Sequence, residues 1–133
     1  MKEIYSQLKT IMEENHIKVV VVEDIPISNH NNLKTGKDLS ILHGVIMGLC
    51  FEQCLPYVVY NPSAWRSLVG TYDGTREGTK REVQKQAAVD MVNKLYNLNF
   101  NYFKTETKNN KSDDDMAEAI LIAKAYLLEN KED

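Results

Sequence analysis

The sequence predicts an α/β fold in which two central parallel strands are flanked by helices. The first observation behind this prediction is the β-branched run at residues 17–22, which is typical of a strand buried on both faces of a parallel sheet. The second is the order of the segments, because stretches with apolar residues at helical spacing precede and follow each strand-like run. A strand, a helix and a second strand in this order predict a right-handed crossover.

Residues 3–15 predict an amphipathic helix whose apolar stripe consists of Ile4, Leu8, Ile11 and Met12. The strand at 17–22 follows and ends in Glu23, and Pro26 then blocks further ladder pairing. An acid at the carboxyl end of a buried strand lies where open α/β sheets place their ligands. The simpler interpretation of Glu23 is a polar strand end that faces water.

Residues 28–37 are polar and predict a loop, which leads into a helix at 38–53. Gly44 and Gly48 lie i,i+4 on that helix, so they would let it pack close to a sheet or to a partner helix. The second short strand is predicted at 57–60.

The second half of the chain is mainly helical. The expected order is a short helix at 64–69, a Gly-rich loop at 70–79, a helix at 80–98, a polar connection at 97–111 and a last helix to about residue 130. The inward face of the helix at 80–98 is expected to carry Val83, Ala87, Met91 and Leu95. Trp65 is interpreted as a core residue rather than a ring for base stacking. The Gly-rich loop is not a P-loop, because Arg81 stands where that motif requires Ser or Thr.

The last helix opens with Asp113, Asp114 and Asp115, and Glu118 follows. Asp115 and Glu118 are spaced i,i+3, so both carboxylates leave one helix face a turn apart. Carboxylates this close repel unless a cation lies between them, and hard oxygen ligands suit Mg²⁺ or Mn²⁺. The alternative is a well-capped helix start, with Ser112 as N-cap and Asp115 completing a capping box.

The overall composition is that of a soluble protein. The 133 residues fit one domain, and the net charge is only −3. Basic residues concentrate in the middle and late chain, and acids crowd the end. No apolar run is long enough to span a membrane and no signal peptide opens the chain, so a cytoplasmic location is expected. Cys50 and Cys54 are expected to be reduced.

Three motifs resemble those of RuvC-like Holliday junction resolvases, which have the ribonuclease H-like fold. They are Val22-Glu23 at the strand end, Lys80-Arg81-Glu82-Val83-Gln84 after the glycine-containing loop, and Asp115-Met116-Ala117-Glu118-Ala119 on the last helix. The closing motif has Glu118 where the family usually has Asp. The resemblance runs over nearly the whole chain, and the order and spacing of the motifs carry it.

The resemblance implies one ribonuclease H-like (RuvC-type) domain over residues 1–133, from which the family's N-terminal β-hairpin region is absent. That region carries the family's first catalytic Asp, which has no counterpart here. The implied metal ligands for Mg²⁺ or Mn²⁺ are Glu23, Asp115 and Glu118, with Asp114 in reserve. Lys80 would act at the scissile phosphate as a further catalytic residue, and the DNA-binding residues would be Arg66, Arg76, Lys80 and Arg81.

The resulting prediction is a metal-dependent, structure-selective endonuclease that resolves branched DNA by phosphodiester hydrolysis. The alternative is a truncated, catalytically incomplete module that only dimerises or binds DNA. A third class is a small regulatory α/β domain whose acids are helix caps. Without the missing strands, one edge of residues 17–22 would be unpaired, and such an edge recruits another strand. A homodimer is therefore expected. The resemblance implies branched DNA as its partner, and no membrane partner is expected.

Overall fold

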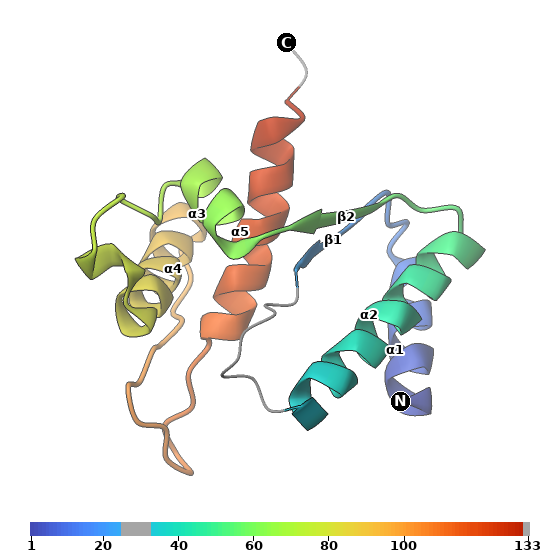
Figure 1. Cartoon of the computed structure of the whole chain (residues 1–133), viewed down its shortest axis with the longest axis horizontal. Helices are drawn as coiled ribbons and strands as arrows, with labels where there is room; N and C mark the ends of the chain where they lie inside the picture. The colour runs from blue at the N-terminus through green and yellow to red at the C-terminus, as the bar shows by residue number, and fades with distance from the viewer. Residues whose placement is uncertain (25–32, 132–133) are drawn as a thin grey trace. The chain divides into compact units, whose positions relative to one another are not determined.

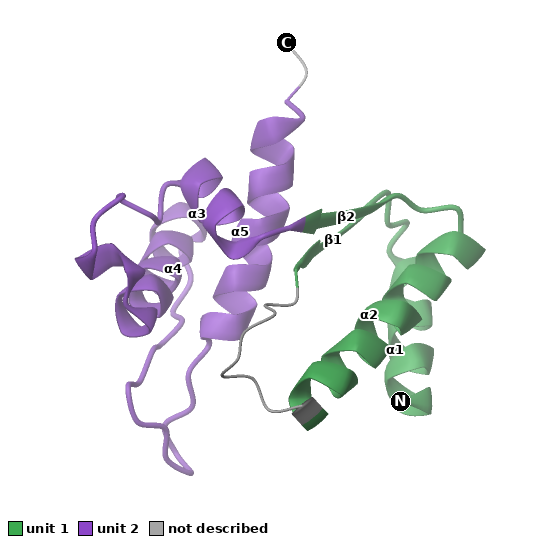
Figure 2. Cartoon of the chain, in the orientation of Figure 1, with its two compact units in different colours: residues 1–59 green, residues 60–133 purple. Residues whose placement is uncertain are grey.

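The computed structural model describes residues 1–24 and 33–131. Its elements follow the expected order of helices and strands (Figure 1). They are α1 (Lys2–Glu14), β1 (Val20–Glu23), α2 (Leu33–Glu52), β2 (Tyr57–Tyr60), α3 (Pro62–Val69), the 3-10 helix η1 (Glu77–Thr79), α4 (Arg81–Tyr96) and α5 (Asp114–Glu129). The chain divides into two compact units, Met1–Val59 and Tyr60–Asp133, and each is described by itself (Figure 2).

The first unit combines α1 and α2 with the strands. β1 and β2 form a two-stranded parallel sheet, as predicted, and the backbone N–H of Val20 donates to the carbonyl of Pro56 at 3.0 Å. The core of this unit is built from Met12, Leu49 and Cys50. Because α1 and α2 both contribute to that core, it joins the two helices and packs them against the start of the sheet.

Three expectations for the first unit are wrong in detail. The strand begins at Val20 rather than at residue 17, and its side chains are half-buried rather than covered on both faces. A sheet of two strands covers little of either face, which accounts for this. Ile4 and Ile11 are 41% and 50% exposed, so Leu8 and Met12 form the inward stripe of α1. Residues 33–37 are the start of α2 rather than loop, and the rest of the predicted loop, at 25–32, lies outside the described residues.

The second unit is a cluster of helices in which α5 packs against both α3 and α4. α3 begins at an N-cap, Asn61, whose Oδ1 accepts from the backbone N–H of Ala64 at 2.8 Å, and it ends at Gly70 with φ of +87°. Trp65 is fully buried, which confirms that it belongs to the core. The remaining fully buried side chains on α4 and α5 are small or medium-sized, which lets the helices approach closely: Ala88, Val89, Val92, Ala117, Leu121 and Ala125.

Two expectations for the second unit are also wrong. Val83 and Leu95 are 38% and 47% exposed, and α4 buries Ala88, Val89 and Val92 instead. A stripe repeated every four residues drifts around a helix of 3.6 residues per turn, so 83-87-91-95 cannot stay on one face. The predicted capping box is absent as well, because the N-cap of α5 is Asp113 and makes no side-chain cap bond.

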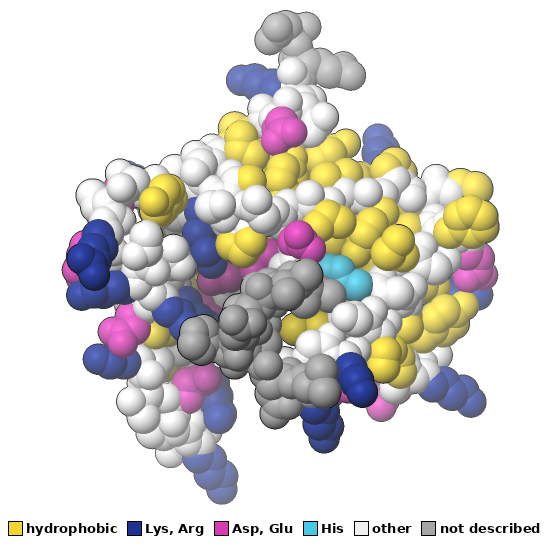
Figure 3. Space-filling model, in the orientation of Figure 1, with side chains coloured by type: hydrophobic (Ala, Val, Ile, Leu, Met, Phe, Trp, Pro, Cys, Tyr) yellow, Lys and Arg dark blue, Asp and Glu magenta, His cyan; other side chains and the backbone are white. Residues whose placement is uncertain are grey.

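Apolar side chains remain at the surface of the first unit, and Figure 3 shows them along α2. Phe51, at the end of this helix, is 88% exposed, and Met47, one turn before it, is 52% exposed. Cys50 and Cys54 are both free thiols, as expected. Within the part of the chain that the structure describes, no helix has the length and apolar character needed to cross a lipid bilayer.

Candidate functional site

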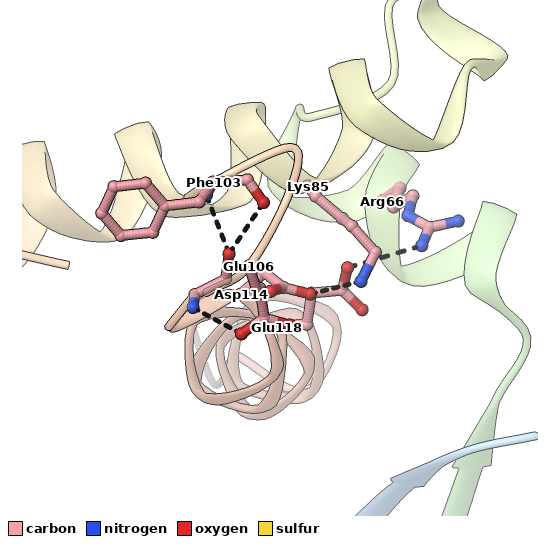
Figure 4. A network of polar contacts seen from close by, with 7 residues as sticks. Arg66, Lys85, Phe103, Glu106, Asp114 and Glu118 are labelled. Atoms are coloured by element: carbon pink, nitrogen blue, oxygen red, sulfur yellow. Dashed lines mark hydrogen bonds and ion pairs between the residues drawn. The ribbon is translucent and has the colours of Figure 1, made fainter. Parts of the chain in front are cut away.

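Each α-helix of the second unit carries a charged residue next to, or within, its row of buried side chains. These helices are α3, α4 and α5. On α3, Arg66 follows the buried Trp65. On α4, Lys85 lies one turn before Ala88, on the face that contacts α5. On α5, Asp114 and Glu118 lie i,i+4, and the buried Ala117 lies between them. The four charges meet where α5 crosses the other two helices, and Figure 4 shows them from close by.

Lys85 forms the tighter contact, an ion pair of its Nζ with Oδ2 of Asp114. Asp114 is 6% exposed and is the one buried charged residue among those the structure describes. Burying a carboxylate without compensation costs several kcal/mol, by order of magnitude about 3–5. Lys85 therefore supplies the charge that makes this position of Asp114 tolerable.

Arg66 lies beside the second carboxylate, with 3.9 Å between its Nη2 and Oε1 of Glu118. Both side chains are mostly buried, at 15% and 17% exposure. The guanidinium carbon of Arg66 also lies 4.9 Å from the centre of the Trp65 ring, a cation–π distance. Its Nε is buried and has no hydrogen-bond partner among residues 1–24 and 33–131. Arg66 thus retains donor capacity that its neighbours in this unit do not use.

The acids that open α5 lie in different environments. Asp114 is buried and Glu118 is half-buried, whereas Asp115 is exposed. The carboxylate of Asp113 accepts from the backbone N–H of Asn101 at 3.0 Å, and so it fixes the connection between α4 and α5. The pair that shares the inward face of α5 is therefore Asp114 with Glu118, spaced i,i+4.

Glu23 is the last residue of β1, as expected from the sequence. It belongs to the first unit, whereas Asp114, Asp115 and Glu118 belong to the second. It is half-buried and takes part in an interaction, so it is not a free carboxylate.

The donor atoms of the described residues supply only part of a metal site. Among the described residues no three or more Asp, Glu, His or Cys side chains form a group that could hold a metal ion. Asp114 and Glu118 offer carboxylate oxygens from one helix face, which is part of a ligand set for a hard cation. Lys85 and Arg66 already balance their charge. Within the second unit the donor set is therefore partial, and a metal site stays a prediction.

The predicted DNA-binding residues fall into two groups. Arg66 belongs to the buried charge cluster. Arg76, Lys80 and Arg81 are exposed near the start of α4, where Lys80 is the N-cap and Arg81 is the first residue. Nζ of Lys80 lies 2.9 Å from Oε2 of Glu77, and the two side chains are 64% and 70% exposed. A pair this exposed contributes little to stability, so Lys80 is available to an incoming phosphate.

Lys85 was missed from the sequence, although its position carried a signal. It lies three and four residues before Ala88 and Val89, which places it on their face of α4. The same rule applied backwards from Ala117 and Leu121 would have selected Asp114 on α5. Lys85 is therefore the residue that was missed, whereas Asp114 was named only as a reserve ligand and not as a member of the buried face.

The Gly-rich loop before α4 is organised around Asp73. Its Oδ1 accepts from the backbone N–H of Thr75 at 2.8 Å and from the Thr75 hydroxyl at 2.7 Å. These bonds hold the pKa of Asp73 below its usual range, and the bond from the hydroxyl contributes most. A Cβ on Gly78 would lie 2.3 Å from Oδ1 of Asp73, so a larger residue there would require this carboxylate to move.

Comparisons with known proteins bear on the fold. No protein-family model matches the chain, and no curated protein sequence matches it. Among solved structures it is similar to T. thermophilus RuvC in complex with Holliday junction substrate, with a TM-score of 0.63 and 16% sequence identity. The match covers 96% of this chain and 65% of the RuvC chain. At this identity the likeness concerns the fold alone, so the chain has a RuvC-like α/β fold and spans less than two thirds of that protein's length.

Proposed function

We propose that this chain acts on branched DNA as a RuvC-like, structure-selective endonuclease that hydrolyses phosphodiester bonds with the help of Mg²⁺ or Mn²⁺. The observation that carries the proposal is the likeness in fold over 96% of the chain to a RuvC that is bound to a Holliday junction. The acids and the exposed cations of the second unit add to it. Fold alone does not determine function, so the proposal must be tested by substituting the site residues.

The proposed ligands of the metal are Glu23, Glu118 and an aspartate at the start of α5. Burial favours Asp114 over Asp115 for the last role, since Asp114 shares the inward face with Glu118 and Asp115 is exposed. A divalent ion held there would supply Lewis-acid stabilisation of charge on the phosphate. Lys85 and Arg66 are proposed to hold Asp114 and Glu118 in place, because each is paired with one of them.

The exposed cations Arg76, Lys80 and Arg81 are proposed to bind the DNA backbone, with Lys80 at the phosphate that is cut. Contacts of this kind position the DNA without reading its sequence. Their contribution weakens as salt rises, because each neutralised phosphate releases counterions. A homodimer is proposed as the binding unit, and sedimentation at tens of micromolar protein tests it: a monomer at that concentration would contradict it.

The second candidate is a module that binds branched DNA without cutting it. The specific observation in its favour is that Asp114 and Glu118 are already neutralised by Lys85 and Arg66. A charge cluster of this kind holds three helices together without any metal. In this case Glu23 would be a polar strand end and the DNA would be held by the exposed cations alone.

One experiment separates the candidates. A labelled synthetic four-way junction and a linear duplex of equal length are each incubated with the chain, in Mn²⁺, in Mg²⁺ and in excess chelator. Cleavage of the junction that needs the metal and is lost in Glu118→Gln supports the endonuclease. Tighter binding to the junction than to the duplex, without cleavage, supports the binding module. Equal or undetectable binding to both DNAs overturns both candidates.

A further inference from the structure

A cleft of about 430 Å³ opens in the second unit between the start of α4 and the connection that leads to α5. Two aromatic side chains, Tyr102 and Phe103, line it from the connection. Arg81 and Lys104 add positive charge to the lining. The volume falls in the range of sites for small ligands, and the combination of rings with cations fits a ligand that is both aromatic and anionic.

Tyr102 also lines a second hollow, of about 470 Å³, that continues along the exposed face of α4 past Val83 and Gln86. The two hollows share Tyr102 and Glu82. Tyr102 thus stands between two adjoining spaces rather than against the core. An aromatic ring in this position can offer a face to a planar group lying in either space.

The wall that carries the rings is fixed, although it has no regular secondary structure. Three residues of the wall are each held by a pair of hydrogen bonds of 2.8–3.2 Å, namely Phe100 by Asn93, Asn101 by Asp113 and Phe103 by Ser112. The last of these is drawn at Phe103 in Figure 4. Tyr102 lies between two of the residues so held, which sets the path of its backbone. A site preorganised in this way loses little entropy when a ligand binds.

The cations of the cleft are available. Arg81 forms no ion pair within residues 1–24 and 33–131. Nζ of Lys104 lies 3.4 Å from Oε2 of Glu82, but the two side chains are 75% and 57% exposed, so the pair is weak and easily exchanged. A phosphate could therefore recruit both cations. The carboxylates of Glu82, Glu106 and Asp114 on the same lining would oppose a ligand that carries negative charge throughout. This favours a mixed ligand with one phosphate and one apolar ring.

We propose that this cleft binds one unpaired nucleotide of a DNA strand, with its base stacked on Tyr102 and its phosphate held by Arg81 and Lys104. The inference rests on the proposed function, because it assigns a place to a nucleotide that is released from pairing at a branch. Stacking on an aromatic ring tolerates every base, so the site confers no sequence preference. It selects DNA in which a base is free.

Two probes of equal charge test the proposal: an eight-nucleotide oligothymidylate and an abasic strand of the same length, which keeps the phosphates and lacks the bases. The full chain is expected to bind the oligothymidylate about tenfold more tightly, the effect of one stacked base. Tyr102→Leu should abolish this preference, and Tyr102→Phe, which keeps the ring, should retain it. Tyr96→Leu removes a 46% exposed tyrosine of α4 that lines neither hollow, and it should change nothing.

The outcomes separate this inference from the proposed function. Equal binding of the two strands by a chain that still binds the four-way junction overturns the nucleotide site alone. A preference that survives in Tyr102→Leu, with circular dichroism showing that the variant is folded, also overturns it. A chain that binds neither the junction nor either strand overturns the site and the proposed function together.

Discussion

Lys85 of α4 and Asp114 of α5 form an ion pair at the contact between their helices, with Asp114 only 6% exposed. Buried ion pairs are often no more stabilising than apolar residues of similar volume, because both charges lose their hydration. Breaking one is nevertheless destabilising, since the remaining charge has no partner. The pair therefore makes the packing of α5 on α4 depend on charge.

Replacing Lys85 by Met leaves Asp114 buried without a partner, and we expect the free energy of unfolding to fall by about 3 kcal/mol. The double variant Lys85→Met with Asp114→Leu should recover most of this loss, because it leaves no unpaired charge. Urea unfolding followed by the fluorescence of Trp65, the single tryptophan of the chain, measures both. Lys94→Met, at an exposed position of α4, should stay within about 0.5 kcal/mol of the parent. A Lys85→Met variant as stable as this control would show that Asp114 needs no partner.

The choice between Asp114 and Asp115 as a metal ligand gives a second prediction. Asp114 shares the inward face of α5 with Glu118, and Asp115 is exposed. We therefore expect Asp114→Asn to weaken Mn²⁺ affinity, measured by calorimetry, by about tenfold or more, and Asp115→Asn to leave it unchanged. If Asp115→Asn weakened Mn²⁺ affinity and Asp114→Asn did not, Asp115 would be the ligand. No change in either variant or in Glu118→Gln would mean that α5 holds no metal.

The order of elements was predictable because it depends on local signals. The β-branched run before Glu23, the cap at Asn61 and Pro62, and the apolar periodicity of the helices each act within a few residues. β1 and β2 pair because strands that follow one another in the chain are usually neighbours in a sheet. Even so, β1 is half-buried rather than fully buried, because burial depends on how many strands and helices cover a sheet and not on the strand's own residues.

The charged cluster was harder to predict, for a physical reason. Hydrophobic periodicity identifies a buried face only by its apolar members. It therefore does not select Lys85 or Asp114, although their spacing places both on buried faces. Asp115 and Glu118 were selected by a family motif with i,i+3 spacing. The structure instead buries the residue one position earlier, because Asp114 continues the stripe of Ala117 and Leu121.

The glycines of α2 provide a third prediction. A Cβ built on Gly44 meets no atom within 4 Å among the described residues. Gly44→Ala should therefore raise the free energy of unfolding by about 0.5–1 kcal/mol, the gain in helix propensity. Gly70→Ala is the contrasting variant, since Gly70 caps α3 at φ of +87° and alanine there should lower stability by about 1 kcal/mol. Thermal unfolding compares the two. A loss of stability in Gly44→Ala would indicate that something packs against this face, such as a second copy of the chain.

The Gly-rich loop gives a prediction about pH. The Thr75 hydroxyl, and then its backbone N–H, donates to Asp73 and holds the pKa of that carboxyl below its ordinary value of 3.8. Because the folded-state pKa is the lower one, the carboxylate stabilises the loop above about pH 4, and this contribution is lost as the pH falls through the folded-state pKa. Thr75→Val removes the stronger donor, so the pKa of Asp73 should rise toward 3.8 in an NMR titration.

Two further variants test whether the carboxylate is the organising group of this loop. Thr79→Val removes a hydroxyl that bonds the carbonyl of Arg76 and not Asp73, so it should leave the pKa of Asp73 unchanged. Gly78→Ala places a Cβ 2.3 Å from Oδ1 of Asp73 and should force the carboxylate away from Thr75. The pKa of Asp73 should then rise as it does in Thr75→Val, and combining the two variants should add little. If Gly78→Ala left the pKa low, the loop would have moved around an intact Asp73–Thr75 pair, and the close fit at Gly78 would not be what holds that carboxylate in place.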